Sequence, residues 1–211
     1  MIDVDTRLRM GCVVAKAESE AARCLMQMLK QAHPDAPPAL ATDAKGGYEE
    51  AIVEAWGEVP AYKGKGRPPT RKRPRSDWQY VQVQKIRSGS RLIEVRTEVI
   101  FGDAQEVMAL LGKHTAYIER SQLTSRQMNG RLVRKTLSFS KALRRLEASC
   151  LWEDAVYNWT RAHQSLRTPS SIPGRKWDPR TPAMAAGLTD RAWSVRELLT
   201  SVVPPNAINL A

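Results

Sequence analysis

The sequence predicts an α/β fold, because segments with the two-residue period of strands occur beside segments with the 3.6-residue period of helices. In residues 91–101 the apolar side chains of Ile93, Val95 and Val99 alternate with charged ones. In residues 19–33, by contrast, apolar side chains recur every three or four positions. A chain of 211 residues can bury a core and ordinarily forms one or two domains.

The first 56 residues are expected to form four elements in order. A hairpin of Ile2–Val4 and Leu8–Ala15 is followed by a helix that Ser19 caps and that ends before Pro34. A short strand, Ala39–Ala41, then runs into Thr42 and Asp43, and a helix follows over Tyr48–Trp56.

The middle of the chain predicts a half-buried antiparallel hairpin of Trp78–Ile86 and Arg91–Phe101. Asp103 is then expected to cap a short helix that Gly112 ends, with Val107, Leu110 and Leu111 facing inward. Residues 116–141 are expected to form a further helix after it.

The last third predicts a long helix from Ser140 to about Arg167, then a linker over 168–176. The helix has apolar positions that predict packing: Leu143, Leu146, Cys150, Trp152, Val156 and Trp159. His163 is interpreted as a surface or helix-end histidine. A small closing unit spans Thr181–Leu199, with a helix over Ser194–Leu199, and Ser201–Ala211 is expected to be disordered.

The charge balance favours an acidic partner. With 33 basic and 22 acidic residues the net charge is +11 and the sequence pI is near 9.9, which predicts attraction to phosphates or acidic membrane surfaces. No segment approaches the ~18 consecutive apolar residues of a membrane span, and we expect no membrane partner. The three scattered cysteines indicate neither a disulfide framework nor a zinc site. With no secretion signal at the N-terminus, a reducing cytoplasm is expected.

Residues 63–75 interleave basic side chains with Pro and Gly, which predicts an exposed loop without a core. As a phosphate-contacting loop it would make binding salt-sensitive; the alternative is a merely solvated insertion. Its candidate DNA contacts are Lys63, Lys65, Arg67, Arg71, Lys72, Arg73 and Arg75.

Residues 116–141 hold one carboxylate, Glu119, among several cations. Wound as one helix, they place Arg120, Arg131 and Arg134 on a basic stripe with Glu119 and Arg126 beside it. Such a face suits a metal ion held against a polyanion. The alternative is an ordinary amphipathic helix whose charges face water.

Asp43 is the second candidate carboxylate, at the end of a predicted strand and before a loop and helix. In α/β folds ligands bind at this rim of the sheet. The alternative is an ordinary turn or helix-start residue.

Four ordered segments resemble a known family. Tyr-Ile-Glu-Arg-Ser-Gln-Leu-Thr-Ser-Arg-Gln (117–127), with Arg-Lys-Thr-Leu-Ser-Phe-Ser-Lys (134–141), is similar to the block around the final acid of bacterial insertion-sequence DDE transposases. The closest subgroup is the one typified by the first-named insertion sequence. Residues 41–48 resemble the segment with the second Asp, 157–167 the Tyr-Asn…Arg-x-His-x-x-Leu-Arg ending, and 181–193 the C-terminal signature.

The resemblance implies a ribonuclease-H-like mixed sheet flanked by helices, in which two Asp and one Glu hold a pair of Mg²⁺ ions for DNA strand cleavage and transfer. Asp43 would be the second Asp and Glu119 the Glu, both catalytic and metal-binding. The candidate phosphate contacts are Arg120, Arg126, Arg131 and Arg134. The interval between Asp43 and Glu119 is long for the family, and Ala44 departs from its usual Asp-Gly.

The resemblance also implies a domain plan. Residues 1–167 would form the catalytic core, with the basic loop 63–75 and the hairpin 78–101 inserted, and residues 168–211 a linker and a small helical tail. Family members generally act as multimers on DNA ends, so an intact member is expected to be a homo-oligomer bound to transposon-end and target DNA.

The family's first Asp is missing from this pattern. Asp3 and Asp5 match the turn after the family's second strand better than its catalytic first strand. We therefore expect an N-terminally shortened transposase that lacks the first central strand and is incomplete as a catalyst. Two alternatives remain: a non-catalytic DNA-binding protein or transposase remnant, and a ribonuclease-H-like nuclease.

Overall fold

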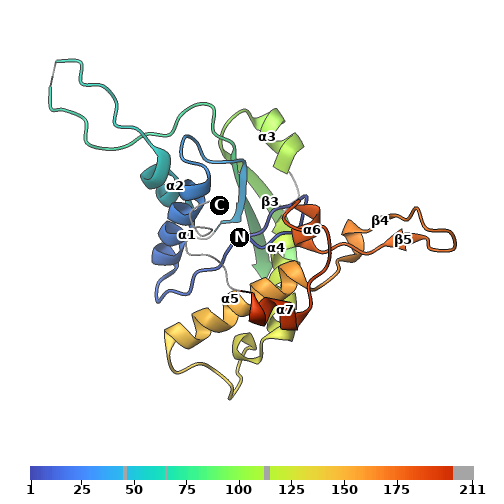
Figure 1. Cartoon of the computed structure of the whole chain (residues 1–211). Coiled ribbons are helices and arrows are strands. Elements are labelled where there is room, and N and C mark those ends of the chain that lie inside the picture. The colour runs from blue at the N-terminus through green and yellow to red at the C-terminus, as the bar shows by residue number, and fades with distance from the viewer. Residues whose placement is uncertain (45–46, 65, 112–114, 202–211) are drawn as a thin grey trace. The chain divides into compact units, whose positions relative to one another are not determined.

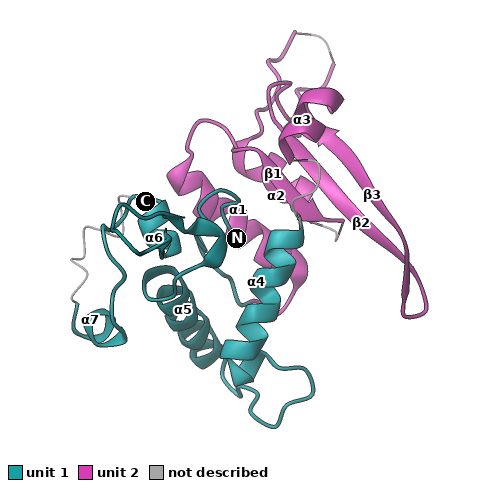
Figure 2. Cartoon of the chain, turned by 90° about the vertical axis from the view of Figure 1, so that its right-hand side faces the viewer, with its two compact units in different colours: residues 1–14, 116–209 teal, residues 15–115, 210–211 magenta. Residues whose placement is uncertain are grey.

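The computed structural model describes residues 1–44, 47–64, 66–111 and 115–201, which form two compact units (Figures 1 and 2). Unit 1 comprises the described residues within 1–14 and 116–209, and unit 2 those within 15–115. Helices accompany a three-stranded mixed sheet, so the predicted α/β class is confirmed.

The sheet of unit 2 contains β1 (Leu40–Asp43), β2 (Tyr80–Ser88) and β3 (Arg91–Phe101) in that spatial order. β1 pairs with β2 in parallel, and β2 pairs with β3 as the predicted antiparallel hairpin. The turn between β2 and β3 is tight because Gly89 takes a φ of 59°, a left-handed value that glycine adopts without a steric cost.

The core of the sheet lies at the base of this hairpin. Val81 of β2 packs with Val107 and Leu111 of α3 (Ala104–Leu111), and Ala41 and Val99 lie against them. The predicted Asp103 cap is confirmed: its Oδ1 accepts hydrogen bonds from the backbone N–H groups of Gln105 (2.9 Å) and Glu106 (3.0 Å).

Two burial predictions in this unit are wrong. Leu110, expected to face inward, is 52% exposed. In β3, Ile93 and Val95 are 62% and 50% exposed, so the hairpin is half-buried only near its base. The alternation of apolar and charged residues correctly predicted strand β3. Burial of its apolar face also requires a second layer over it, and α3 covers only the base of the hairpin. The predicted end of α3 at Gly112 lies outside the described residues.

α1 (Glu18–Ala32) and α2 (Tyr48–Trp56) pack on each other through apolar side chains. The predicted bounds of α2 are confirmed. The expected Ser19 cap is wrong, because α1 begins at Glu18 and its N-cap, Ala17, has no side-chain capping bond. Trp56 Nε1 donates to the carbonyl of His33 at 2.7 Å, which connects the two helix ends. The buried side chains of the pair are Ala22, Met26, Leu29, Ala51, Ile52, Ala55 and Trp56.

In unit 1, α4 (Thr115–Met128) and α5 (Leu143–Trp159) are both shorter than predicted. α4 gives way to a 3-10 turn, η1 (Gly130–Leu132), because the Asn129 side chain accepts a hydrogen bond from the Arg131 N–H and caps a new turn. The single helix expected over 116–141 is therefore wrong. α5 starts after Ser140 and ends at Trp159, well before Arg167.

The rest of unit 1 consists of short elements (Figure 1). The expected N-terminal hairpin reduces to a single bridge between Ile2 and Arg9. The expected linker over 168–176 lies within a small hairpin. The predicted helix at 194–199 is confirmed, with Ser194 accepting from Glu197 N–H as its cap. These elements are η2 (Gln164–Leu166), β4 (Thr168–Pro169), β5 (Trp177–Asp178), α6 (Pro182–Ala185) and α7 (Val195–Thr200).

A buried arginine holds the N-terminal segment against α4 and α5. The Arg9 side chain is 4% exposed, and its Nη1 donates to Glu153 Oε1 at 2.7 Å and to Asp154 Oδ1 at 3.1 Å. Its Nε donates to Ser121 Oγ at 2.8 Å, and its Nη2 to the Ser121 carbonyl at 2.9 Å.

The backbone and the aromatic face of Arg9 are held as well. Its N–H donates to Asn158 Oδ1 at 2.9 Å, and its carbonyl accepts from Asn158 Nδ2 at 2.8 Å. The guanidinium lies 3.9 Å from the ring centroid of Tyr157, a cation–π contact. The buried face of α5 is therefore polar, whereas two of its expected apolar packing positions, Leu143 and Trp152, are 46% and 40% exposed.

We expect Arg9→Met to lower the free energy of unfolding by about 3–5 kcal/mol, because it leaves the buried Glu153 carboxylate without its partner. Urea unfolding measures the loss. The control is Arg191→Met, which removes an exposed ion pair with Glu197 and should cost less than about 1 kcal/mol. Equal effects of the two substitutions would show that the Arg9 network does not stabilise unit 1.

Candidate functional site

Asp43 lies where the sequence predicted it, at the carboxyl end of β1, and it is exposed. Next to it the Thr42 hydroxyl and the Tyr80 hydroxyl are hydrogen-bonded at 2.8 Å. Burial raises the pKa of Tyr48, at the start of α2, and the Asp43 charge raises that pKa further. Asp43 is thus a carboxylate on the sheet rim, close to the first residue of a helix.

Glu119 lies in the first turns of α4 and is exposed. Nearby, the Arg7 guanidinium lies 3.6 Å from the ring centroid of Tyr117, so a cation is fixed on this part of the helix. Glu119 belongs to unit 1 and Asp43 to unit 2, and their joint action on a metal stays a prediction. Among the described residues, no three side chains of His, Cys, Asp or Glu form a cluster that could hold a metal ion.

Asp3 and Asp5, the candidates for the first Asp, lie in the N-terminal turn. Asp3 Oδ2 accepts a hydrogen bond from the Thr6 N–H at 2.8 Å and another from the Thr6 hydroxyl, which is the geometry of an Asx turn. Asp5 is exposed. The carboxylate of Asp3 therefore has a structural role.

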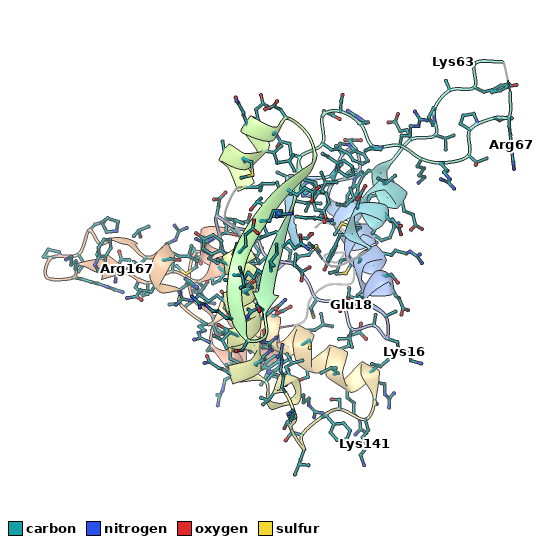
Figure 3. The ribbon with its side chains drawn as sticks, turned by 180° about the vertical axis from the view of Figure 1, so that it is seen from behind. Lys16, Glu18, Lys63, Arg67, Lys141 and Arg167 are labelled. Carbon is teal, nitrogen blue, oxygen red and sulfur yellow. The ribbon has the colours of Figure 1, made fainter. Side chains whose placement is uncertain are left out.

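The basic loop of unit 2 is anchored near the end of α2 and just before β2. Arg75 pairs with Asp77 at 2.6 Å, and Lys72 Nζ donates to the Glu54 carbonyl at 2.6 Å. Arg73 pairs through its backbone with Glu58. Lys63 and Arg67 lie at the far end of the loop, away from the sheet (Figure 3). The remaining candidates are Arg71, which is exposed, and Lys65, which lies outside the described residues.

The predicted basic stripe of Arg120, Arg131 and Arg134 is wrong as a helical face. Arg120 and Arg126 are on α4, but Arg131 lies in η1 and Arg134 in the loop beyond it, because the helix ends at Met128. Arg131 Nη1 donates to Ser140 Oγ at 2.8 Å, while Arg134 is exposed. The cations of this region therefore belong to a helix and a following loop.

Unit 1 also carries positive charge around His163. This half-buried imidazole accepts from or donates to Ser165 Oγ at 2.9 Å. Burial lowers the pKa of His163, and the nearby charges of Arg7, Arg120 and Arg161 lower it further. Three arginines close enough to lower this pKa mark a local excess of cations, which the sequence pattern did not predict because Arg7 is distant in the chain.

The end of α4, η1 and one face of α5 line an open cavity of about 550 Å³. Both polar and apolar side chains line it, and Trp152, which is 40% exposed, forms part of the wall. The sequence pattern assigned Trp152 to packing, and its neighbours in the chain, Leu151 and Glu153, gave no signal of a cavity. Its principal lining residues are Met128, Asn129, Arg131, Ser149, Trp152 and Glu153.

Groups near the buried Arg9 network have shifted pKa values. Burial raises the pKa of Asp154 above the usual carboxylate range, and the Arg9 charge only partly opposes that effect. Burial likewise raises the pKa of the Cys12 thiol to about 12, and the charges of Asp154 and Cys150 add to the effect. Cys24, by contrast, is exposed on α1.

We expect iodoacetamide at pH 8 to alkylate Cys12 at least about 100-fold more slowly than Cys24, because only the thiolate reacts and Cys12 is held as the thiol. Peptide mass spectrometry after timed quenching measures both rates. In about 8 M urea, a concentration that unfolds most small proteins, the alkylation rates of Cys12 and Cys24 should converge. A Cys12 rate equal to that of Cys24 in the folded protein would contradict this environment.

Comparison with protein-family models, curated proteins and solved structures finds no match to the chain. Within the described residues, no helix combines the length and the apolar character needed to cross a membrane.

Proposed function

We propose that the chain is a DNA-binding protein of transposase descent, with a ribonuclease-H-like core that is incomplete for DDE-type strand transfer. The resemblance of the four sequence segments motivates the descent. The mixed sheet of unit 2, with Asp43 at its rim, is compatible with such a core.

The observation that carries DNA binding is the exposure of cations in loops of both units, on a chain with a net charge of +11. In unit 2 these are Lys63, Arg67 and Arg71. In unit 1, Arg134 and Lys141 occupy the loop between η1 and α5, and Lys141 points away from the helix (Figure 3). Loops of this kind contact phosphates without reading sequence, so the proposed binding is salt-sensitive.

The metal expected in an intact family member is Mg²⁺, and the carboxylates of Asp43 and Glu119 are the oxygen donors that this ion prefers. Both side chains are exposed. When bound, the ions would activate an attacking hydroxyl or water and stabilise the leaving oxygen. This chain's own part would be to hold them through Asp43 and Glu119. Asp3, a candidate for the third carboxylate of the family pattern, is held in a turn by Thr6, which supports binding rather than catalysis as the present function.

Substituting Lys63, Arg67 and Arg71 together by Ala should weaken duplex DNA binding. It should also reduce the slope of log K against log salt by about 0.9 for each phosphate that the loop no longer neutralises. Fluorescence anisotropy across a salt series measures both.

The control removes three equal charges that already pair with carboxylates, at Arg23, Arg175 and Arg191. It should change the slope much less. If both triple variants lower the slope equally, net charge rather than the loop explains binding.

With Mg²⁺ and DNA carrying transposon ends, we expect binding without strand transfer, because two carboxylates hold a metal pair less well than three. Gel analysis of labelled DNA checks this. Glu119→Gln and Asp43→Asn should leave binding unchanged. Nicking that is lost in both variants, yet kept in the α5 control Glu147→Gln, would contradict the incomplete-catalyst proposal and support an active enzyme.

A further inference from the structure

The cavity between the end of α4 and α5 has walls that are fixed by contacts within unit 1. Asn129 is 7% exposed, and its Nδ2 donates to Ser149 Oγ at 2.9 Å. Glu153 is 6% exposed and is held by Arg9 at 2.7 Å. A volume of about 550 Å³ falls within the roughly 300–1,000 Å³ of small-molecule pockets. Fixed polar walls lower the ordering cost of binding.

The apolar part of the wall fits an aromatic ring. Trp152 remains 40% exposed although it is the largest side chain type, and Met128 and Val156 accompany it in the lining. An exposed indole in a hollow is a stacking surface, and every nucleobase has a face that can stack on it.

The polar part of the wall fits a phosphate and the edge of a base. Arg131 is exposed, and its Nη1 is oriented by Ser140 Oγ at 2.8 Å, so its planar guanidinium is positioned to bind an anion. Asn129 carries an amide and Glu153 a carboxylate, groups that accept hydrogen bonds from base amino groups. The Glu153 charge is already paired with Arg9, which limits its repulsion of a phosphate.

The neighbouring loop favours a nucleotide within a DNA strand over a free one. Between η1 and α5 it exposes the cations Arg134, Lys135 and Lys141, together with Leu137 (98% exposed) and Phe139 (59% exposed). Cations combined with exposed apolar and aromatic side chains suit a strand whose bases are unstacked. A paired base is enclosed in the duplex stack, and an unpaired base requires the least energy to move into a pocket.

We propose that this cavity binds one unpaired nucleotide of a DNA strand, with its base stacked on Trp152 and its phosphate on Arg131. The inference rests on the proposed DNA binding and adds a ligand class for one site.

The test compares two duplexes of identical sequence, one fully paired and one with a single bulged base, by fluorescence anisotropy at fixed salt. The protein should bind the bulged duplex about tenfold more tightly. Trp152→Ala should reduce this ratio to about one, and Trp152→Phe should keep most of it. The control is Trp177→Ala, a substitution of a similarly exposed tryptophan outside the cavity lining, which should leave the ratio unchanged.

A second pair of variants tests the phosphate contact independently of the indole. Arg131→Gln should reduce the ratio, whereas Arg134→Gln should weaken binding to both duplexes alike. If circular dichroism shows that Trp152→Ala does not fold, the two arginine variants still test the proposed nucleotide site.

The outcomes separate the two proposals. No binding to either duplex overturns the proposed function together with this inference. Binding with a ratio near one, or a ratio that Trp152→Ala and Trp177→Ala lower equally, overturns the inference alone. If deoxyadenosine monophosphate competes for the cavity while the ratio stays near one, the ligand is a free nucleotide, and the assignment to a DNA strand is wrong.

Discussion

The buried guanidinium of Arg9 is the constraint on which unit 1 depends. It joins the N-terminal segment to Ser121 of α4 and Glu153 of α5 through hydrogen bonds of 2.7–2.9 Å. A buried charge is stable only when its donors are matched, and five donors on one rigid plane tie several elements to one geometry. The cavity follows from the same constraint, because Arg9 fixes Glu153, which lines it.

Local patterns were enough to predict much of unit 2. The strand ending at Asp43, the helix Tyr48–Trp56 and the Asp103 cap all depend on residues within a few positions of one another. Such short-range patterns can be recognised in the sequence without the tertiary structure. Burial was less predictable: Ile93 alternates correctly yet is exposed, since exposure depends on which layer covers the strand.

Unit 1 was less predictable for two physical reasons. The Asn129 side chain accepts a hydrogen bond from the Arg131 N–H where α4 ends. A short polar side chain of this kind can occupy a helix position or cap a turn, so the sequence alone did not predict which. Arg9 is one of 33 basic residues, and its burial arises from partners more than a hundred positions away. Of the candidate site, the positions of Asp43 and Glu119 on their elements could be predicted, whereas Trp152 was assigned to packing because the cavity arises only from tertiary structure.

The division of unit 1 into two separate stretches of chain has a consequence for synthesis on the ribosome. Residues 15–115 are continuous and can fold as they emerge, but residues 1–14 must wait for α5. At about 5–20 residues per second that delay is on the order of ten seconds. Throughout it, Arg9 has none of its carboxylate partners, so the order of translation itself leaves this guanidinium open to premature contacts.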